Sequence, residues 1–204
     1  MSITNYSELV DAITGWMNDA SLSAYAPDFI AMAEASFNRR LANLEMEGTA
    51  TIAAAASVSL PTDFISIKTL YLDTDPRKLL EPMSEGDLRR YWAAQTTGEP
   101  ASYALASESI LLGPAPDTTY TLSMTYLRKL TPLSASNITN WLLEAHPDLY
   151  LYASLLHGEF RGWNDDRLPM IGNAVDTIIS EINMAGNRRR TASGMRMRSV
   201  QERI

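Results

Sequence analysis

The fold is decided by residues 118–127, Thr-Thr-Tyr-Thr-Leu-Ser-Met-Thr-Tyr-Leu, in the middle of the chain. Large side chains at positions 120, 122, 124 and 126 alternate with threonine and serine. Such alternation predicts a strand with one buried and one exposed face, whereas a helix needs apolar residues three or four positions apart. The centre of the chain is therefore expected to form a sheet.

Other strand-like segments precede this stretch, back to about residue 49. They are short, β-branched or alternating, and they are interrupted by Pro61 and by Asp75-Pro76. A short helix is expected at 85–94. The other predicted strands are residues 50–52, 57–60, 65–72, 101–105 and 109–112. We therefore expect a β-rich insertion over residues 48–129.

Both ends of the chain have the period of amphipathic helices. The first predicted helix covers residues 6–18 and begins after a Thr4 or Asn5 cap, and the second begins at Pro27 and ends where Gly48 interrupts the pattern. Two more are predicted from Pro147 to Phe160 and from Leu168 to Gly186, where the glycine ends the helix. Neither pair of helices buries both its faces alone, so helices from the two ends must meet. We expect an α+β fold: mainly an α-helical bundle, residues 1–47 and 130–186, which carries the β-rich insertion.

The composition excludes several classes of protein. The chain has 204 residues, 46% of them hydrophobic, and no cysteine, which rules out disulfides and thiolate sites. No apolar run approaches the roughly 20 residues of a membrane span. The first residues lack the basic start and apolar core of a signal peptide, so we expect the protein to fold in the compartment where it is made, the cytoplasm.

Charge is divided unequally along the chain, whose net charge is −7. Residues 187–204 contain six arginines and one acid, while the rest of the chain contains 11 basic and 23 acidic residues. The apolar periodicity of the preceding helix does not continue into these residues, so we expect a flexible basic C-terminal arm over residues 187–204. Three interpretations stay open for it: a nucleic-acid arm, a solvated terminus, or a docking arm. Apolar residues between the arginines favour docking.

No catalytic, cofactor-binding or metal-binding residue is predicted. The sequence has no phosphate-binding loop, nucleophile elbow or paired zinc histidines. His146 and His157 lie eleven positions apart, and we interpret them as a helix cap and a polar-face residue. Asp165 and Asp166 could together hold a divalent cation, but we interpret them as the acidic start of the last helix.

The four tryptophans also have two interpretations. They could stack on sugars or nucleobases, or they could pack in the core or against another subunit. Packing is favoured because most of them lie in apolar stripes or at helix ends. They are Trp16, Trp92, Trp141 and Trp163.

Several segments of the chain resemble a known family. Residues 141–156, Trp-Leu-Leu-Glu-Ala-His-Pro-Asp-Leu-Tyr-Leu-Tyr-Ala-Ser-Leu-Leu, are followed by Asp-Asp-Arg at 165–167 and an amphipathic helix. Together they look like the C-terminal signature of tailed-phage head-to-tail connector adaptors of the tail tubular protein A type. The segments at 37–41 and 60–64 are similar to the first half of that family.

The resemblance implies a structural virion protein of the neck, without enzymatic activity or a cofactor. It implies a dodecameric ring beneath the portal protein, with the other face of the ring receiving tail or nozzle proteins. Genomic DNA would pass through the channel without specific binding, and no membrane would be involved. The arm would dock onto the portal. The expected docking residues are Arg188, Arg189, Arg190, Met195, Arg196, Met197, Arg198, Val200, Arg203 and Ile204.

Two other functions remain as alternatives. The basic tail could belong to a DNA-binding accessory protein, which would neutralise phosphates with strong salt dependence. The chain could instead be a tail-associated hydrolase, which would need a convergent acidic pocket.

Overall fold

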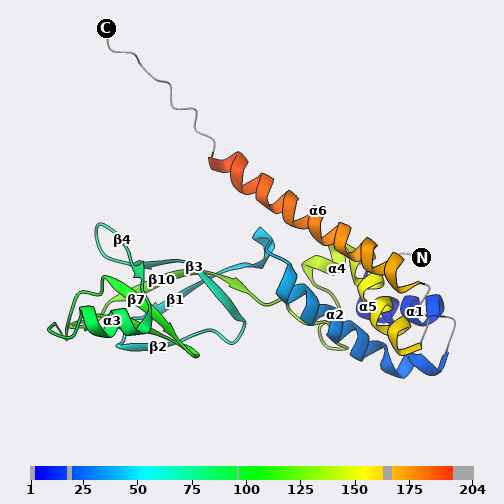
Figure 1. Cartoon of the computed structure of the whole chain (residues 1–204), viewed down its shortest axis with the longest axis horizontal. Helices are drawn as coiled ribbons and strands as arrows, with labels where there is room; N and C mark the ends of the chain where they lie inside the picture. The colour runs from blue at the N-terminus through cyan, green and yellow to red at the C-terminus, as the bar shows by residue number, and fades with distance from the viewer. Residues whose placement is uncertain (1–2, 18–19, 96, 163–166, 195–204) are drawn as a thin grey trace, which may run out of the picture. The chain divides into compact units, whose positions relative to one another are not determined.

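A computed structural model describes residues 3–17, 20–95, 97–162 and 167–194 of the chain (Figure 1). Contacts divide the chain into a helical unit, Met1–Glu45 with Leu130–Ile204, and a β unit, Met46–Lys129. The chain therefore leaves the helical unit once and returns to it once. Helices and strands are both abundant, which confirms the predicted α+β fold.

The helical unit is organised around one helix from the second half of the chain. Its helices are α1 Tyr6–Met17, α2 Ala26–Arg40, α4 Trp141–Ala145, α5 Pro147–Gly162 and α6 Leu168–Gly194, with a 3-10 segment, Ala20–Tyr25, before α2. The helix α5 packs against α1, α2 and α6. Helices from the two ends of the chain thus meet, as predicted.

The start of α1 is fixed by the side chains of Asn5, one of the two caps expected from the sequence, and of Glu8. The Asn5 Oδ1 atom accepts a hydrogen bond from the Glu8 amide at 3.0 Å, and the Glu8 carboxylate accepts from the Thr4 amide at 2.7 Å. Both amide groups would otherwise lack a partner at a helix start. The hydrogen bond from the Thr4 amide is the main reason that the pKa of Glu8 lies below its usual value.

The end of α2 differs from the prediction. The apolar stripe continues through Leu41 and Leu44 and predicted a helix up to Gly48, but α2 ends at Arg40. Leu41 is buried from an extended backbone, with φ −89° and ψ 136°, and its amide donates to the Phe37 carbonyl. The stripe therefore reports the burial of Leu41 correctly but not its conformation. Leu44 is half-buried and begins a 3-10 turn, Leu44–Met46, and Gly48 lies in a strand.

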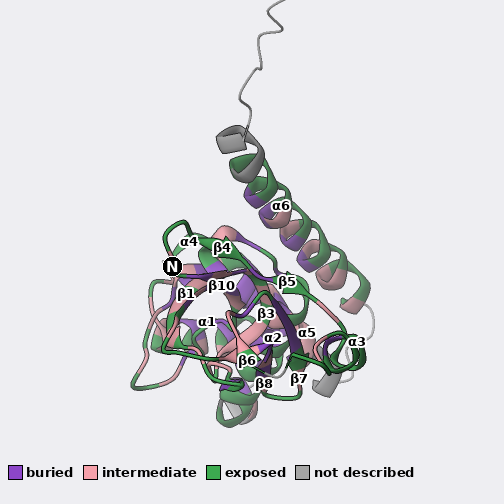
Figure 2. Cartoon of the chain, turned by 90° about the vertical axis from the view of Figure 1, so that its left-hand side faces the viewer, coloured by how far each residue is buried: buried purple, intermediate pink, exposed green. Residues whose placement is uncertain are grey.

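The end predicted for the last helix at Gly186 is wrong, because α6 continues to Gly194. Buried positions follow one side of α6 and exposed positions the other (Figure 2). Gly186 is on the buried side, where a Cβ atom would lie 2.8 Å from the Asn43 Oδ1 atom. Glycine thus permits close packing here and does not end the helix. Residues 187–194, expected to begin the flexible arm, are helical, and residues 195–204 lie outside the described part.

The described residues of the β unit form two four-stranded sheets and a two-stranded one. Their orders are β1-β10-β3-β4, β2-β8-β7-β5 and β6-β9. Pairing is antiparallel except between β5 and β7 and between β6 and β9. The elements are β1 Glu47–Ala53, β2 Ser57–Ser59, β3 Phe64–Leu72, β4 Lys78–Leu79, β5 Glu81–Pro82, α3 Glu85–Tyr91, β6 Thr97–Gly98, β7 Ser102–Ala106, β8 Ser109–Gly113, β9 Ala115–Pro116 and β10 Thr121–Arg128.

The strand β10 supplies the centre of this unit's core. Leu122, Met124 and Tyr126 are buried, as the alternation predicted, while Thr121 is exposed. Leu122 lies opposite Ile52 of β1 and Leu72 of β3, so it has a strand on each side. The period-two pattern thus identified both the strand and its buried face.

Candidate partner-binding surface of the helical unit

Side chains of α6 attach this helix to the end of α2. The Asn183 Nδ2 atom donates to the Arg40 carbonyl at 2.9 Å, and its Oδ1 atom accepts from the Ala42 amide at 3.0 Å. An ion pair joins Arg40 Nη2 to Asp176 Oδ1 at 2.5 Å. Asn183 thus provides hydrogen-bond partners for backbone groups at the end of α2 that have no partner within the helix. The sequence offered no signal for this contact, which spans more than 140 positions.

The arginine-rich end of α6 contacts another segment of the helical unit. Arg188 and Arg189 are exposed, and Arg189 Nη1 lies 3.2 Å from Glu45 Oε1. An exposed pair of this kind contributes about 0–1 kcal/mol. Arg190 also belongs to α6. The other expected docking residues, all outside the described part, are Met195, Arg196, Met197, Arg198, Val200, Arg203 and Ile204.

An acidic groove lies beside this end of α6. It has a volume of about 550 Å³ and runs between α6, the start of α5, α4 and the segment after α2. Four carboxylates surround it, those of Glu45, Glu144, Asp148 and Glu181. Its apolar lining comes from Trp141, Ile178, Ile182 and Ala185. The acidic groove therefore combines a negative rim with an apolar surface.

A second groove, of about 530 Å³, is mainly apolar. We call it the apolar groove; it is lined by Trp16 of α1, Tyr152 and Leu155 of α5, and Met170 and Ile171 of α6, among others. The rings of Trp16 and Tyr152 meet edge to face, with centroids 6.2 Å apart. Trp16 is 56% exposed and Met170 is 74% exposed, so this tryptophan is not a core residue. Exposed apolar surface of this kind is typical of protein contacts.

The helical unit also contains a buried polar node formed by Glu34, Asn140 and Tyr150. The Glu34 Oε1 atom accepts from the Tyr150 hydroxyl at 3.0 Å and from the Leu133 amide at 2.8 Å. The Asn140 side chain donates to the Tyr150 hydroxyl at 2.7 Å and caps α4 by accepting from the Leu143 amide. The buried polar node therefore joins α2 to α5 and to the segment that returns from the β unit.

Burial raises the pKa of the Glu34 carboxyl, although its two hydrogen bonds act in the opposite direction. The pKa of Tyr150 is also raised, by burial first and then by the Glu34 carboxylate. Ordinary desolvation explains both directions, since the charged form is disfavoured away from water. This geometry supports a structural role for the buried polar node.

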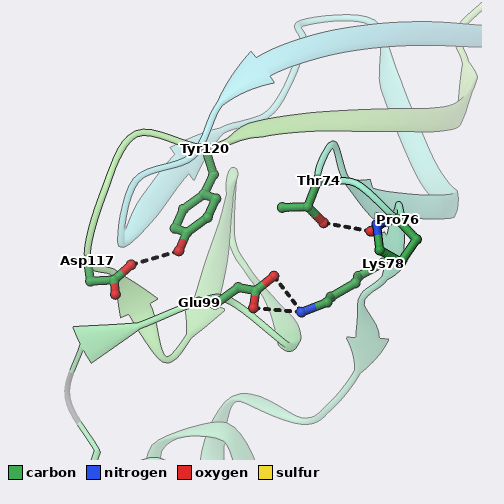
Figure 3. A network of polar contacts seen from close by, with 6 residues as sticks. All are labelled: Thr74, Pro76, Lys78, Glu99, Asp117 and Tyr120. Atoms are coloured by element: carbon green, nitrogen blue, oxygen red, sulfur yellow. Dashed lines mark hydrogen bonds and ion pairs between the residues drawn. The ribbon is translucent and has the colours of Figure 1, made fainter.

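The polar contacts of the β unit in Figure 3 are exposed and involve residues of loops and Lys78 of β4. The Lys78 ammonium lies 2.7 and 2.6 Å from the two Glu99 oxygens, and the Tyr120 hydroxyl donates to Asp117 at 2.9 Å. The Thr74 hydroxyl donates to the Pro76 carbonyl at 2.9 Å. The pKa of Tyr120 is raised, mainly because its hydroxyl is hydrogen-bonded to Asp117.

The remaining candidates from the sequence do not form a reactive site in the described ranges. His146 follows α4, and His157 is half-buried, with a pKa lowered first by burial and then by Arg39. Asp165 and Asp166 lie outside the described residues, as does Trp163. Where the structure describes the chain, no three histidine, aspartate or glutamate side chains gather as metal ligands. No described helix is long and apolar enough to cross a membrane.

The chain is similar to a known protein family. The model of the SU10 adaptor protein family matches residues 4–199, a range that includes both units and continues into the basic end. No curated protein matches the chain significantly.

Proposed function

Because the chain belongs to the SU10 adaptor protein family, we propose that it is a head-to-tail connector adaptor of the tail tubular protein A type. The protein is a phage structural adaptor and a component of the virion. The proposal goes further: copies of the chain form a dodecameric ring beneath the portal protein, and the other face of the ring receives tail or nozzle proteins. Subunits are made in the host cytoplasm and end in the neck of the particle.

The match over residues 4–199 carries this proposal, and two surface features support it. The apolar groove offers exposed Trp16 and Met170, which are suited to contacts between neighbouring subunits. The chain outside residues 187–204 is strongly acidic, with 23 acidic and 11 basic residues. A ring of such subunits repels DNA, so a genome passes through during ejection without adhering.

We further propose that the basic end of the chain docks onto the portal. Arg189 already pairs with Glu45 of its own helical unit, so docking relies mainly on Arg188, Arg190 and residues 195–204. The last ten residues alternate arginine with methionine and valine, which can anchor a segment that orders on its partner. A DNA-binding role for this end, or a hydrolase function, has no specific observation in its favour.

Co-sedimentation with purified portal rings tests the proposal. A chain that ends at Gly194 keeps all of α6 and is expected to lose most portal binding. The triple variant Arg196→Gln, Arg198→Gln, Arg203→Gln should lose binding similarly. Its matched control, Arg77→Gln, Arg89→Gln, Arg90→Gln, removes three exposed arginines from the β unit and should bind like the wild type. Equal binding by all four proteins would remove the docking assignment.

A further inference from the structure

The acidic groove carries negative charge that its own surroundings leave largely uncompensated. Of its four carboxylates, only that of Glu45 pairs with a cation in the described part of the chain, Arg189. Glu144 accepts a hydrogen bond from the Thr139 hydroxyl, which carries no charge. Asp148 and Glu181 are exposed and form no ion pair among the described residues, although Arg189 also lines the groove. Three carboxylates thus remain for a basic ligand.

The same groove has apolar surface along its length. Trp141 is half-buried on one side, and Ile178, Ile182 and Ala185 come from successive turns of α6 on the other. A ligand suited to this surface needs positive charges with apolar side chains between them. A free inorganic cation would leave the apolar part uncovered, and an apolar peptide would leave the carboxylates unpaired.

The chain itself contains such a segment. Residues 195–204 read Met-Arg-Met-Arg-Ser-Val-Gln-Glu-Arg-Ile, with three arginines, one acid and four apolar residues. We infer that the acidic groove receives residues 195–204 of a second copy of this chain. Arg196 and Arg198 pair with the carboxylates of Glu144 and Glu181, while Met195 and Met197 cover the apolar lining.

The direction of α6 favours a second copy over the same chain. After Gly186, which packs against Asn43, the helix continues for eight residues and so advances about 12 Å. To reach its own groove, the segment after Gly194 would have to reverse immediately and pass Arg189, which already occupies Glu45. A second copy can present the segment without this reversal.

The inference concerns copies of the chain that meet without a portal, so it goes beyond the proposed function. Individual exposed ion pairs are weak, and the association is expected to depend on concentration and salt. In a ring, neighbouring copies would raise the effective concentration of each segment near a groove. A portal competes for the same segment and should release it from the groove.

A charge exchange between two full-length variants tests the inference. The groove variant is Glu144→Lys with Glu181→Lys, and the arm variant is Arg196→Glu with Arg198→Glu. Each variant alone should self-associate at least about tenfold more weakly than the wild type in sedimentation velocity, because like charges then meet. An equal mixture should regain association, since each segment again meets a groove of opposite charge. Circular dichroism checks that every variant is folded.

The matched control is Glu81→Lys with Glu108→Lys, which reverses two exposed carboxylates of the β unit and should associate like the wild type. The inference is overturned if the wild type does not self-associate, if either variant alone associates normally, or if mixing restores nothing. Failure to restore would fit a segment bound within its own chain. Portal co-sedimentation of the same proteins reports the proposed function separately, because the groove variant keeps all its arginines.

Discussion

The two units use polar groups differently. In the β unit, the polar contacts of Figure 3 are exposed, and the interior around Leu122 and Met124 is apolar. In the helical unit, Glu34 and Tyr150 are buried together although 116 positions separate them in the sequence. The β unit thus depends on apolar packing within one continuous segment. The helical unit depends in addition on a buried polar node that only forms when both ends of the chain are folded together.

The largest effect is expected from Leu122→Ala in the β unit. Leu122 is fully buried between two strands, and truncation of such a leucine costs about 2–5 kcal/mol of unfolding free energy. Hydrogen exchange measured by mass spectrometry should show faster exchange in β3 and β10 and little change in α5. The control Thr121→Ala changes an exposed residue of the same strand and should cost at most about 1 kcal/mol. Equal acceleration in both units would contradict this separation.

A smaller, pH-dependent effect is expected from Glu34→Gln in the helical unit. The folded-state pKa of Glu34 is raised, so folding favours the protonated carboxyl. Its contribution is fully present below the unfolded pKa, near 4.3, and is lost as pH rises through the raised folded pKa. Glutamine keeps an acceptor for Leu133 and Tyr150 but does not titrate. The variant should therefore gain stability relative to the wild type as pH increases.

Urea unfolding at several pH values between about 4 and 8 measures this difference. The control Tyr150→Phe keeps the carboxyl but removes one of its hydrogen bonds, and is expected to cost about 1–3 kcal/mol. Because Glu34 still titrates in that control, its stability should still decline with rising pH. A constant difference between Glu34→Gln and wild type at all pH values would show that the carboxyl is not perturbed by burial.

The smallest effect is expected from Lys78→Ala. Its pair with Glu99 is well formed, but both side chains are substantially exposed, at 52% and 37%. Such pairs contribute about 0–1 kcal/mol, and salt screens them further. Thermal unfolding at low and high salt should thus give nearly the same midpoint for variant and wild type. A loss as large as that of Leu122→Ala would show that the surface polar contacts of the β unit matter as much as its core.

Periodicity predicted the elements whose environment is local. The alternation in β10 identified its buried side chains, and the cap at Asn5 located the start of α1, because both depend on near neighbours in sequence. Leu41 shows the limit: its burial was predicted, but its extended conformation was not. An apolar residue can be buried from either backbone conformation.

The missed features depend on distant residues. Gly186 was interpreted as a helix end, since glycine is common there, but its role is set by Asn43 on another segment. Past Gly186, three arginines and an alanine among residues 187–194 are good helix formers, so α6 has no local reason to stop. Glu34 likewise gave no signal in sequence, because its partners Leu133 and Tyr150 lie about 100 positions away. The acidic groove is assembled from equally distant segments.

Pairing between β1 and β10 places Glu47 opposite Leu127, so the two ends of the β unit are hydrogen-bonded neighbours. Opposite residues of antiparallel strands lie only about 5 Å apart. A module that starts and finishes at one point can lengthen, shorten or diverge in sequence while the polypeptide on either side keeps its course.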